Sequence, residues 1–121
     1  MSHKILVIED ERDIRESLKT ILEMCDYKAE VAVNGADGIQ KTTEYNPDLI
    51  LCDVMMPVMD GFKFLETIRS EGINIPLIFL TAKAQHTDLK NGMSLGAANY
   101  LFKPFKSVEL LKAIENTLSN R

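Results

Sequence analysis

Short apolar runs alternate along the chain with longer stretches in which apolar residues recur every three or four positions. The runs have the length of strands, and the periodic stretches between them are typical of amphipathic helices. This alternation repeats five times over the 121 residues. The expected strands are Lys4–Glu9, Lys28–Val33, Leu49–Cys52, Pro76–Leu80 and Asn99–Phe102.

The first two helices are expected from apolar spacing and from turn residues. The second begins at the cap Asn34-Gly35, runs through Tyr45 and stops at Asn46-Pro47, since the residue before a proline avoids the helical conformation. The inward face of the first helix is predicted to hold Ile14, Leu18, Ile21, Leu22 and Cys25.

The later helices follow the same logic. The third opens at Asp60-Gly61, and the fourth, Thr87–Leu95, has few apolar anchors and is expected to be the most mobile. Ser107 is expected to cap the fifth. The inward residues are predicted to be Phe64, Leu65 and Ile68 in the third helix, and Leu111, Ile114 and Leu118 in the fifth.

Strands that alternate with helices predict an α/β fold with a parallel sheet covered on both faces. Right-handed crossovers and one reversal of strand order give a flavodoxin-like, doubly wound (βα)5 sandwich with strand order 2-1-3-4-5. The site of such a fold lies at the carboxyl ends of the strands. The length fits a single domain over residues 1–121.

Composition excludes some classes of function. The net charge is -4, and no run of basic residues is long enough to bind nucleic acid. No apolar stretch approaches the roughly 20 residues of a membrane span, and the first residues do not form a signal peptide. Cys25 and Cys52 match no metal or redox spacing and are interpreted as reduced core thiols. We therefore expect a cytoplasmic protein.

Chemistry-bearing side chains stand where the predicted strands end. Glu9 and Asp10 follow the first strand, Asp53 the third, Thr81 the fourth and Lys103 the fifth. Three carboxylates at one edge of a sheet repel each other, and a hard divalent cation relieves that repulsion. The ammonium and the hydroxyl suit the oxygens of a phosphoryl group. The pattern predicts magnesium and phosphate chemistry in which a carboxylate forms an acyl phosphate.

These motifs, in this order and spacing, resemble the receiver domain of the response regulators of bacterial two-component signalling, and the similarity covers essentially the whole chain. The motifs are Glu9-Asp10, Asp53-x-x-Met56-Pro57-x-x-Asp60-Gly61, Thr81-Ala82 and Lys103-Pro104-Phe105.

The resemblance implies a role for each matched residue. Asp53 would be the phosphate acceptor. Mg2+ would be bound by the carboxylates of Asp10 and Asp53, by the backbone carbonyl of Met55 and, through water, by Glu9.

The remaining matched residues would respond to the phosphoryl group. Thr81 would donate a hydrogen bond to a phosphoryl oxygen, and Lys103 would pair with Asp53 or its phosphate. The Lys103–Pro104 bond would be cis, and Tyr100 stands at the aromatic switch position.

The function implied is a phosphorylation-dependent switch, not a metabolic enzyme. A histidine kinase or phosphotransfer protein would donate the phosphoryl group, and an output partner would read the face formed by the fourth helix, the fifth strand and the fifth helix. Self-phosphorylation from small phosphodonors is expected. Slow self-dephosphorylation is also expected, because Met55 is bulky and cannot orient the attacking water; Met55 and Lys83 flank its route.

One departure from the family bears on assembly. Many DNA-binding regulators of this kind pair through a charge network on their last two elements. Ala98 and Asn99 replace the two acids of that network, and Ala113 stands near the place of its arginine. Such a dimer is therefore not expected here.

Three other functions are compatible with parts of this pattern. A magnesium phosphohydrolase of the aspartyl-phosphate type usually has a second aspartate where Met55 stands. A flavin-binding module needs a hydroxyl- and glycine-rich phosphate loop, whereas Glu9-Asp10-Glu11 would repel a phosphate. An adaptor that has lost phosphorylation is the third, and the complete acceptor set argues against it.

Overall fold

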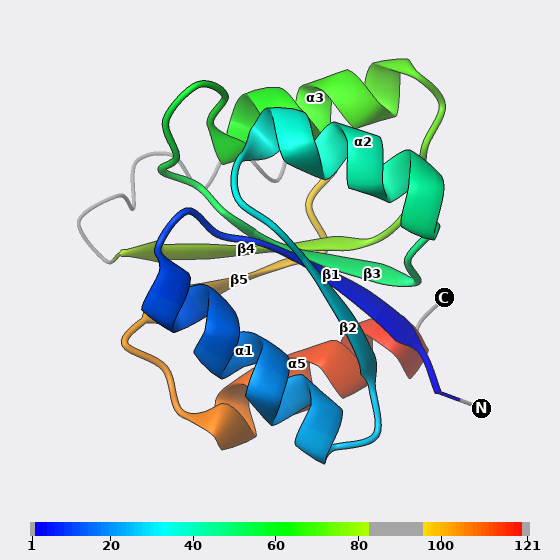
Figure 1. The fold of residues 1–121 in the computed structure, drawn as a ribbon. Coiled ribbons are helices and arrows are strands. Elements are labelled where there is room, and N and C mark those ends of the chain that lie inside the picture. Colours follow the sequence, from blue (N-terminus) through cyan, green and yellow to red (C-terminus); the bar gives the residue numbers. More distant parts are fainter. Residues whose placement is uncertain (1, 83–95, 120–121) are drawn as a thin grey trace.

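A computed structural model of the protein describes residues 2–82 and 96–119, and Figure 1 shows its fold. The strands form one parallel sheet in the order β2-β1-β3-β4-β5, so the predicted flavodoxin-like topology is confirmed. The strands are β1 (Lys4–Ile8), β2 (Lys28–Ala32), β3 (Leu49–Asp53), β4 (Leu77–Ala82) and β5 (Asn99–Lys103). The helices are α1 (Arg12–Met24), α2 (Gly35–Tyr45), α3 (Gly61–Ser70) and α5 (Ser107–Ser119).

The sheet separates two layers of helices. Helices α2 and α3 cover one face, and α1 and α5 cover the other (Figure 1). Because side chains alternate across a strand, β1 sends Leu6 and Ile8 to the α2–α3 face, and Ile5 and Val7 to the α1–α5 face. The result is two separate apolar clusters on the two faces of one sheet.

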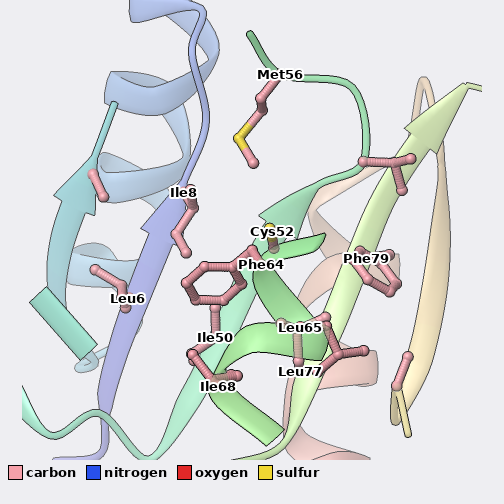
Figure 2. Packing of buried hydrophobic residues seen from close by; sticks show 13 residues of the cluster. Leu6, Ile8, Ile50, Cys52, Met56, Phe64, Leu65, Ile68, Leu77 and Phe79 are labelled. Atoms are coloured by element: carbon pink, nitrogen blue, oxygen red, sulfur yellow. The ribbon is translucent and has the colours of Figure 1, made fainter. Parts of the chain in front are cut away.

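The cluster under α3 lies between this helix and the sheet. Figure 2 shows the Phe64 ring lying over the sheet among Ile8, Ile50 and Cys52, all of them fully buried. The predicted inward face of α3 is therefore confirmed, as is the core position of Cys52.

Helix starts and stops follow the predicted polar signals. The side chain of Asn34 accepts a hydrogen bond from the N–H of Asp37 at 2.8 Å, and that of Asp60 accepts one from the N–H of Lys63 at 2.8 Å. Asn46 ends α2 in the left-handed conformation with φ 52°. These caps fix where α2 and α3 begin relative to the strands before them.

Helix α1 differs from the prediction at its end. Cys25 is exposed, because the helix stops at Met24 and the backbone of Cys25 is no longer helical. The prediction that Cys25 is a core thiol on the inward face was therefore wrong. Leu18 and Leu22 are the buried residues of this helix.

Helix α5 is rotated from the predicted face by about one residue. Leu110, Ala113 and Ile114 are buried, whereas Leu111 and Leu118 are only half-buried. Ser107 is the first helical residue and not the cap. The N–H of Leu110 donates to the carbonyl of Lys106 at 3.1 Å, so the first helical turn closes on Lys106.

The predicted helix Thr87–Leu95 and the residue Lys83 lie outside the described residues, as does the expectation that this helix is the most mobile. Among the helices that the structure describes, none has the length and apolar character needed to cross a bilayer.

Candidate functional site

The parallel register brings the polar strand ends to one edge of the sheet. Ile8 pairs with Cys52, so Glu9 and Asp53 follow side by side at the ends of β1 and β3. Asp53 pairs with Leu80 and Ala82 pairs with Lys103, which places the end of β5 at the same edge. Residues that are far apart in the sequence therefore meet because neighbouring strands end at the same level.

Three carboxylates gather at this edge. Oxygens of Glu9, Asp10 and Asp53 all lie within 4.8 Å of one another. Asp10 is exposed, whereas Asp53 is 7% exposed and Glu9 is fully buried. Such closely spaced acids require a compensating positive charge.

Lys103 supplies part of that charge. Its Nζ lies 3.1 Å from Oε1 of Glu9 and 3.1 Å from Oδ2 of Asp53. Burial opposes the charged form of Lys103, but attraction to Asp53 and Glu9 outweighs it and raises the lysine pKa. Lys103 is thus an ammonium that bridges two acids, and the peptide bond that follows it, to Pro104, is cis as the resemblance implied.

Glu9 has a raised pKa, and its contacts explain why. Burial raises its pKa from 4.5 to about 7, although a hydrogen bond from the N–H of Glu11 opposes the rise. Repulsion by Asp53 adds to the rise and attraction to Lys103 reduces it. The direct Glu9–Lys103 contact was not predicted from the sequence, because nothing in the spacing shows that the longer glutamate side chain reaches the fifth strand.

The loop after β3 shapes the wall of the site. Met55 is 62% exposed, and its N–H lies 3.4 Å from Oδ1 of Asp53. Gly61 lies so close to the strand end that an added Cβ would stand 2.5 Å from the carbonyl oxygen of Asp53. Between them Val58 takes a positive φ of 73°, which is rare for a β-branched residue. The close approach at Gly61 fixes the path by which this loop leaves Asp53.

A cavity of about 320 Å³ opens beside these acids. Its lining comes from Asp10, Glu11, Ile14, Asp53, Met55, Ala82 and Lys103. The exposed acid Asp10 and the acceptor candidate Asp53 therefore face one solvent-accessible space. The donor set fits a magnesium ion, which prefers carboxylate and carbonyl oxygens and keeps several waters.

Two further predicted residues lie next to this group. Thr81 is almost fully buried at the end of β4, and its Oγ1 lies 3.4 Å from the carbonyl of Ala82. Tyr100 is half-buried on β5, and its ring centroid lies 5.4 Å from that of Phe79. Phe79 in turn contacts Phe62 edge to face at 5.1 Å. The rings form a row from α3 across β4 to β5.

One residue that the sequence reading missed is Arg15. Its Nη1 donates to the carbonyls of Glu9 at 3.0 Å and Asp10 at 3.3 Å. The available signal was its spacing, since an arginine one turn into α1 can reach back to the loop that carries both acids.

Comparison with known proteins agrees with this geometry. Residues 5–115 match the family model described as the response regulator receiver domain. The transcriptional regulatory protein DltR of Streptococcus agalactiae is 40% identical over 111 residues, which are 92% of this chain and 50% of that protein. Response regulator MprA of Mycobacterium bovis is 39% identical, over 92% of this chain and 48% of that protein. The chain thus spans about half the length of these curated relatives.

Solved structures show the same fold over nearly the whole chain. The receiver domain of the Francisella response regulator 1452 matches with a TM-score of 0.92 and 31% identity, covering 98% of each chain. The chemotaxis protein CheY4 of Vibrio cholerae matches with a TM-score of 0.91 and 30% identity, covering 97% of this chain and 99% of that one. The chain therefore belongs to the response regulator receiver domains, the phosphorylation-dependent signalling switches of two-component systems.

Proposed function

We propose that Asp53 accepts a phosphoryl group from a phosphohistidine of a partner histidine kinase or phosphotransfer protein, with Mg2+ bound at the acid cluster. One observation carries this proposal. The Asp53 carboxylate lies at the rim of the sheet, within 4.8 Å of two further acids and 3.1 Å from the Lys103 ammonium, and it lines an open cavity. A nucleophile, a cation site and a compensating charge therefore share one pocket.

The transfer is a substitution at phosphorus. An oxygen of Asp53 forms the new bond to phosphorus, the bond from phosphorus to the imidazole nitrogen breaks, and the imidazole leaves with the electron pair. Mg2+ held by Asp10, Asp53 and the Met55 carbonyl, with Glu9 acting through water, would neutralise charge on the phosphoryl oxygens. Lys103, already 3.1 Å from Asp53, keeps a positive charge beside the product.

The switch follows from the charge that phosphorylation adds. Thr81, at the end of the next strand, would donate its hydroxyl to a phosphoryl oxygen, and Tyr100 would follow because its ring packs on Phe79 two residues before Thr81. The output surface would be the predicted face formed by the fourth helix, the fifth strand and the fifth helix, of which the structure describes β5 and α5. A partner or output domain that binds one state of this face shifts the population toward that state.

The same acceptor site would take a phosphoryl group from small phosphodonors and would lose it slowly to water. Neither property makes the chain an enzyme in the ordinary sense. The proposed location is the cytoplasm, where the phosphorylated domain of a kinase would meet it. Phosphohydrolase and flavin-binding functions are not favoured, because the family match and the named relatives are all response regulators.

The test is intact mass spectrometry after incubation with acetyl phosphate, with Mg2+ or with a chelator. Wild type should gain one phosphoryl group only when Mg2+ is present, and peptide mapping should place it on Asp53. Asp53→Asn should gain none. Asp60→Asn is the matched control, because asparagine also caps α3 and Asp60 lies in the same loop.

Labelling of Asp53→Asn to the wild-type extent would overturn the assignment of the acceptor. Full labelling of wild type in the presence of the chelator would overturn the role of the metal.

A further inference from the structure

The loop between β1 and α1 carries two of the three acids, yet the usual helix cap does not hold it. Helix α1 begins at Arg12, and the side chain of its N-cap residue, Glu11, makes no capping hydrogen bond. Glu9 is fixed at both ends: its N–H donates to the carbonyl of Ala32 at 3.1 Å, and its carboxylate accepts from Glu11 and Lys103. Asp10 is exposed and stands between these anchored points.

Arg15 supplies the contact that reaches Asp10. The half-buried guanidinium donates from one nitrogen, Nη1, to two successive carbonyls, those of Glu9 at 3.0 Å and Asp10 at 3.3 Å. Its own N–H donates to the carbonyl of Glu11 at 2.9 Å, as the first turn of α1 requires. Arg15 is therefore tied to three consecutive residues of the loop.

The atoms that Arg15 contacts are as informative as the distances. It binds backbone oxygens and forms no ion pair with the carboxylates of Glu9 and Asp10 among the described residues, and oxygens of both carboxylates lie within 4.8 Å of an oxygen of Asp53. An arginine paired with a carboxylate would compete with a cation for that ligand. An arginine on the carbonyls fixes the direction of the ligand without occupying it, and its positive charge lessens the repulsion among the acids.

We propose that Arg15 is a positioning residue for the divalent cation: by holding the carbonyls of Glu9 and Asp10, it presents the Asp10 carboxylate to the cluster before the metal arrives. The inference rests on the proposed function, in that the cation site is the acid cluster. Its energetic basis is preorganisation, because a ligand that is already oriented loses less conformational entropy when the ion binds.

Two substitutions separate geometry from charge. Arg15→Gln removes the charge and shortens the donor, whereas Arg15→Lys keeps the charge but replaces the planar fork by a single ammonium. The matched control is Arg12→Gln, since Arg12 is exposed at the start of the same helix and makes no side-chain hydrogen bond among the described residues. A purely electrostatic effect would appear in Arg12→Gln and not in Arg15→Lys.

The experiment is calorimetric titration of each protein with Mg2+, together with the metal-free melting temperature and the Mg2+ dependence of phosphorylation by acetyl phosphate. Both Arg15 variants should bind Mg2+ about tenfold more weakly, within the range known for residues that orient metal ligands. Arg12→Gln should bind nearly as wild type. Saturating Mg2+ should restore the maximal phosphorylation rate of the Arg15 variants, because only the concentration of metal required has changed.

Equal Mg2+ affinity in Arg15→Gln and Arg12→Gln would overturn the inference, as would a phosphorylation rate that saturating Mg2+ does not restore. Arg15→Lys serves the same purpose where Arg15→Gln proves too unstable to purify. If wild type itself neither binds Mg2+ nor becomes phosphorylated, the proposed function fails. If wild type does both and the Arg15 variants match it, only the role of Arg15 fails.

Discussion

At the scale of single residues, the site is an arrangement of charges that do not balance. The cluster holds three acids, and its ammonium, that of Lys103, pairs with two of them, Glu9 and Asp53, so the metal-free cluster keeps a net repulsion when all three acids are ionised. The repulsion is confined to a small, partly buried region, where water screens it less than at the surface. The consequences of removing one charge are therefore large enough to measure.

Asp53→Asn should raise the melting temperature of the metal-free protein while abolishing phosphorylation. The substitution removes one of the repelling charges and leaves the Lys103–Glu9 pair, at 3.1 Å, intact. A gain of about 1 kcal/mol corresponds to roughly 3–5 °C for a domain of this size. Differential scanning calorimetry with a chelator measures it, and Asp60→Asn is the control. An unchanged or lower melting temperature would show that repulsion at Asp53 does not limit stability.

The pKa of Glu9 makes metal-free stability depend on pH. Burial raises this pKa from 4.5 to about 7, so the folded protein binds the proton more tightly than the unfolded chain. The resulting stabilisation is complete below pH 4.5 and is lost as the pH rises through about 7. The loss is on the order of 3 kcal/mol at most.

Urea unfolding at a series of pH values, with a chelator present, measures this loss. Glu9→Gln should flatten the slope between pH 5 and 7 that wild type shows, and the exposed Glu16→Gln should keep it. Identical slopes in wild type and Glu9→Gln would contradict the prediction.

Met55 is expected to slow the loss of the phosphoryl group. Its side chain is 62% exposed on the wall of the cavity, and a thioether is too weak an acceptor to orient water. Met55→Asn should therefore accelerate dephosphorylation severalfold, measured as the decay of purified phosphoprotein. Met24→Asn, at an exposed methionine far along α1, should decay as wild type does. Equal decay in all three proteins would contradict this role.

At the scale of the elements, the sequence determined most of the architecture because its signals were local. Asn34 and Asp60 cap helices at the expected places, and the apolar run of β3 is buried along its length. Cys25 was misplaced because the helix end depends on how the chain turns into β2. The inward face of α5 shifted by a residue because tertiary packing decided between Leu110 and Leu111.

The residues that form the site were easier to predict from the sequence than the contacts between them. The strand ends identified the acids and Lys103, since parallel strands bring their carboxyl ends together. Three features could not be predicted, because they depend on the paths of loops, which the spacing of apolar residues does not determine. They are the contact of Lys103 with Glu9, the hydrogen bonds of Arg15 to the backbone and the positive φ of Val58. The roles of the site residues remain predictions that the proposed experiments test.

At Gly61, the first residue of α3 lies against the backbone at the end of β3, so that a side chain has no room there. In Gly61→Ala the new Cβ would lie 2.5 Å from the carbonyl oxygen of Asp53 and 3.0 Å from Cα of Val54, both backbone atoms. We expect a loss of about 2–3 kcal/mol, as for overpacking in a core, and slower phosphorylation because Asp53 moves. Urea unfolding and acetyl phosphate labelling measure the two effects.

The matched control for this prediction is Gly38→Ala. There the nearest atom is Cδ1 at the end of the Ile8 side chain, at 2.6 Å, and not a backbone atom, and alanine favours the helix. This variant should lose less stability and should be phosphorylated at the wild-type rate. Equal losses in both variants would show that the close approach at Gly61 is not special.

At the scale of the whole molecule, the open question is how copies associate. Ala98 and Asn99 are exposed and uncharged, and Ala113 is buried. A charge network of the kind that pairs many DNA-binding relatives lacks its acids and its arginine at these positions. The domain is therefore expected to remain monomeric when it is activated.

Light scattering after size-exclusion chromatography tests this expectation, with and without beryllofluoride and Mg2+. The mass of the chain, 13.6 kDa, should be found in both conditions at micromolar concentration. A dimer of activated wild type would mean that other contacts on this face suffice.

The sheet that divides the apolar interior in two has a consequence for how the protein can change over generations. Among the described residues, the cluster under α1 and α5 and the cluster under α2 and α3 have no member in common. We therefore expect the effects of substitutions in the two clusters on stability to add where the substituted residues are not neighbours in one strand. The residues of one cluster can therefore change during evolution, or be redesigned to suit a different phosphoryl donor. The other cluster then keeps its full capacity to accept destabilising substitutions. A receiver domain can thus change the partner specificity of one face of the sheet without compensating substitutions on the other face.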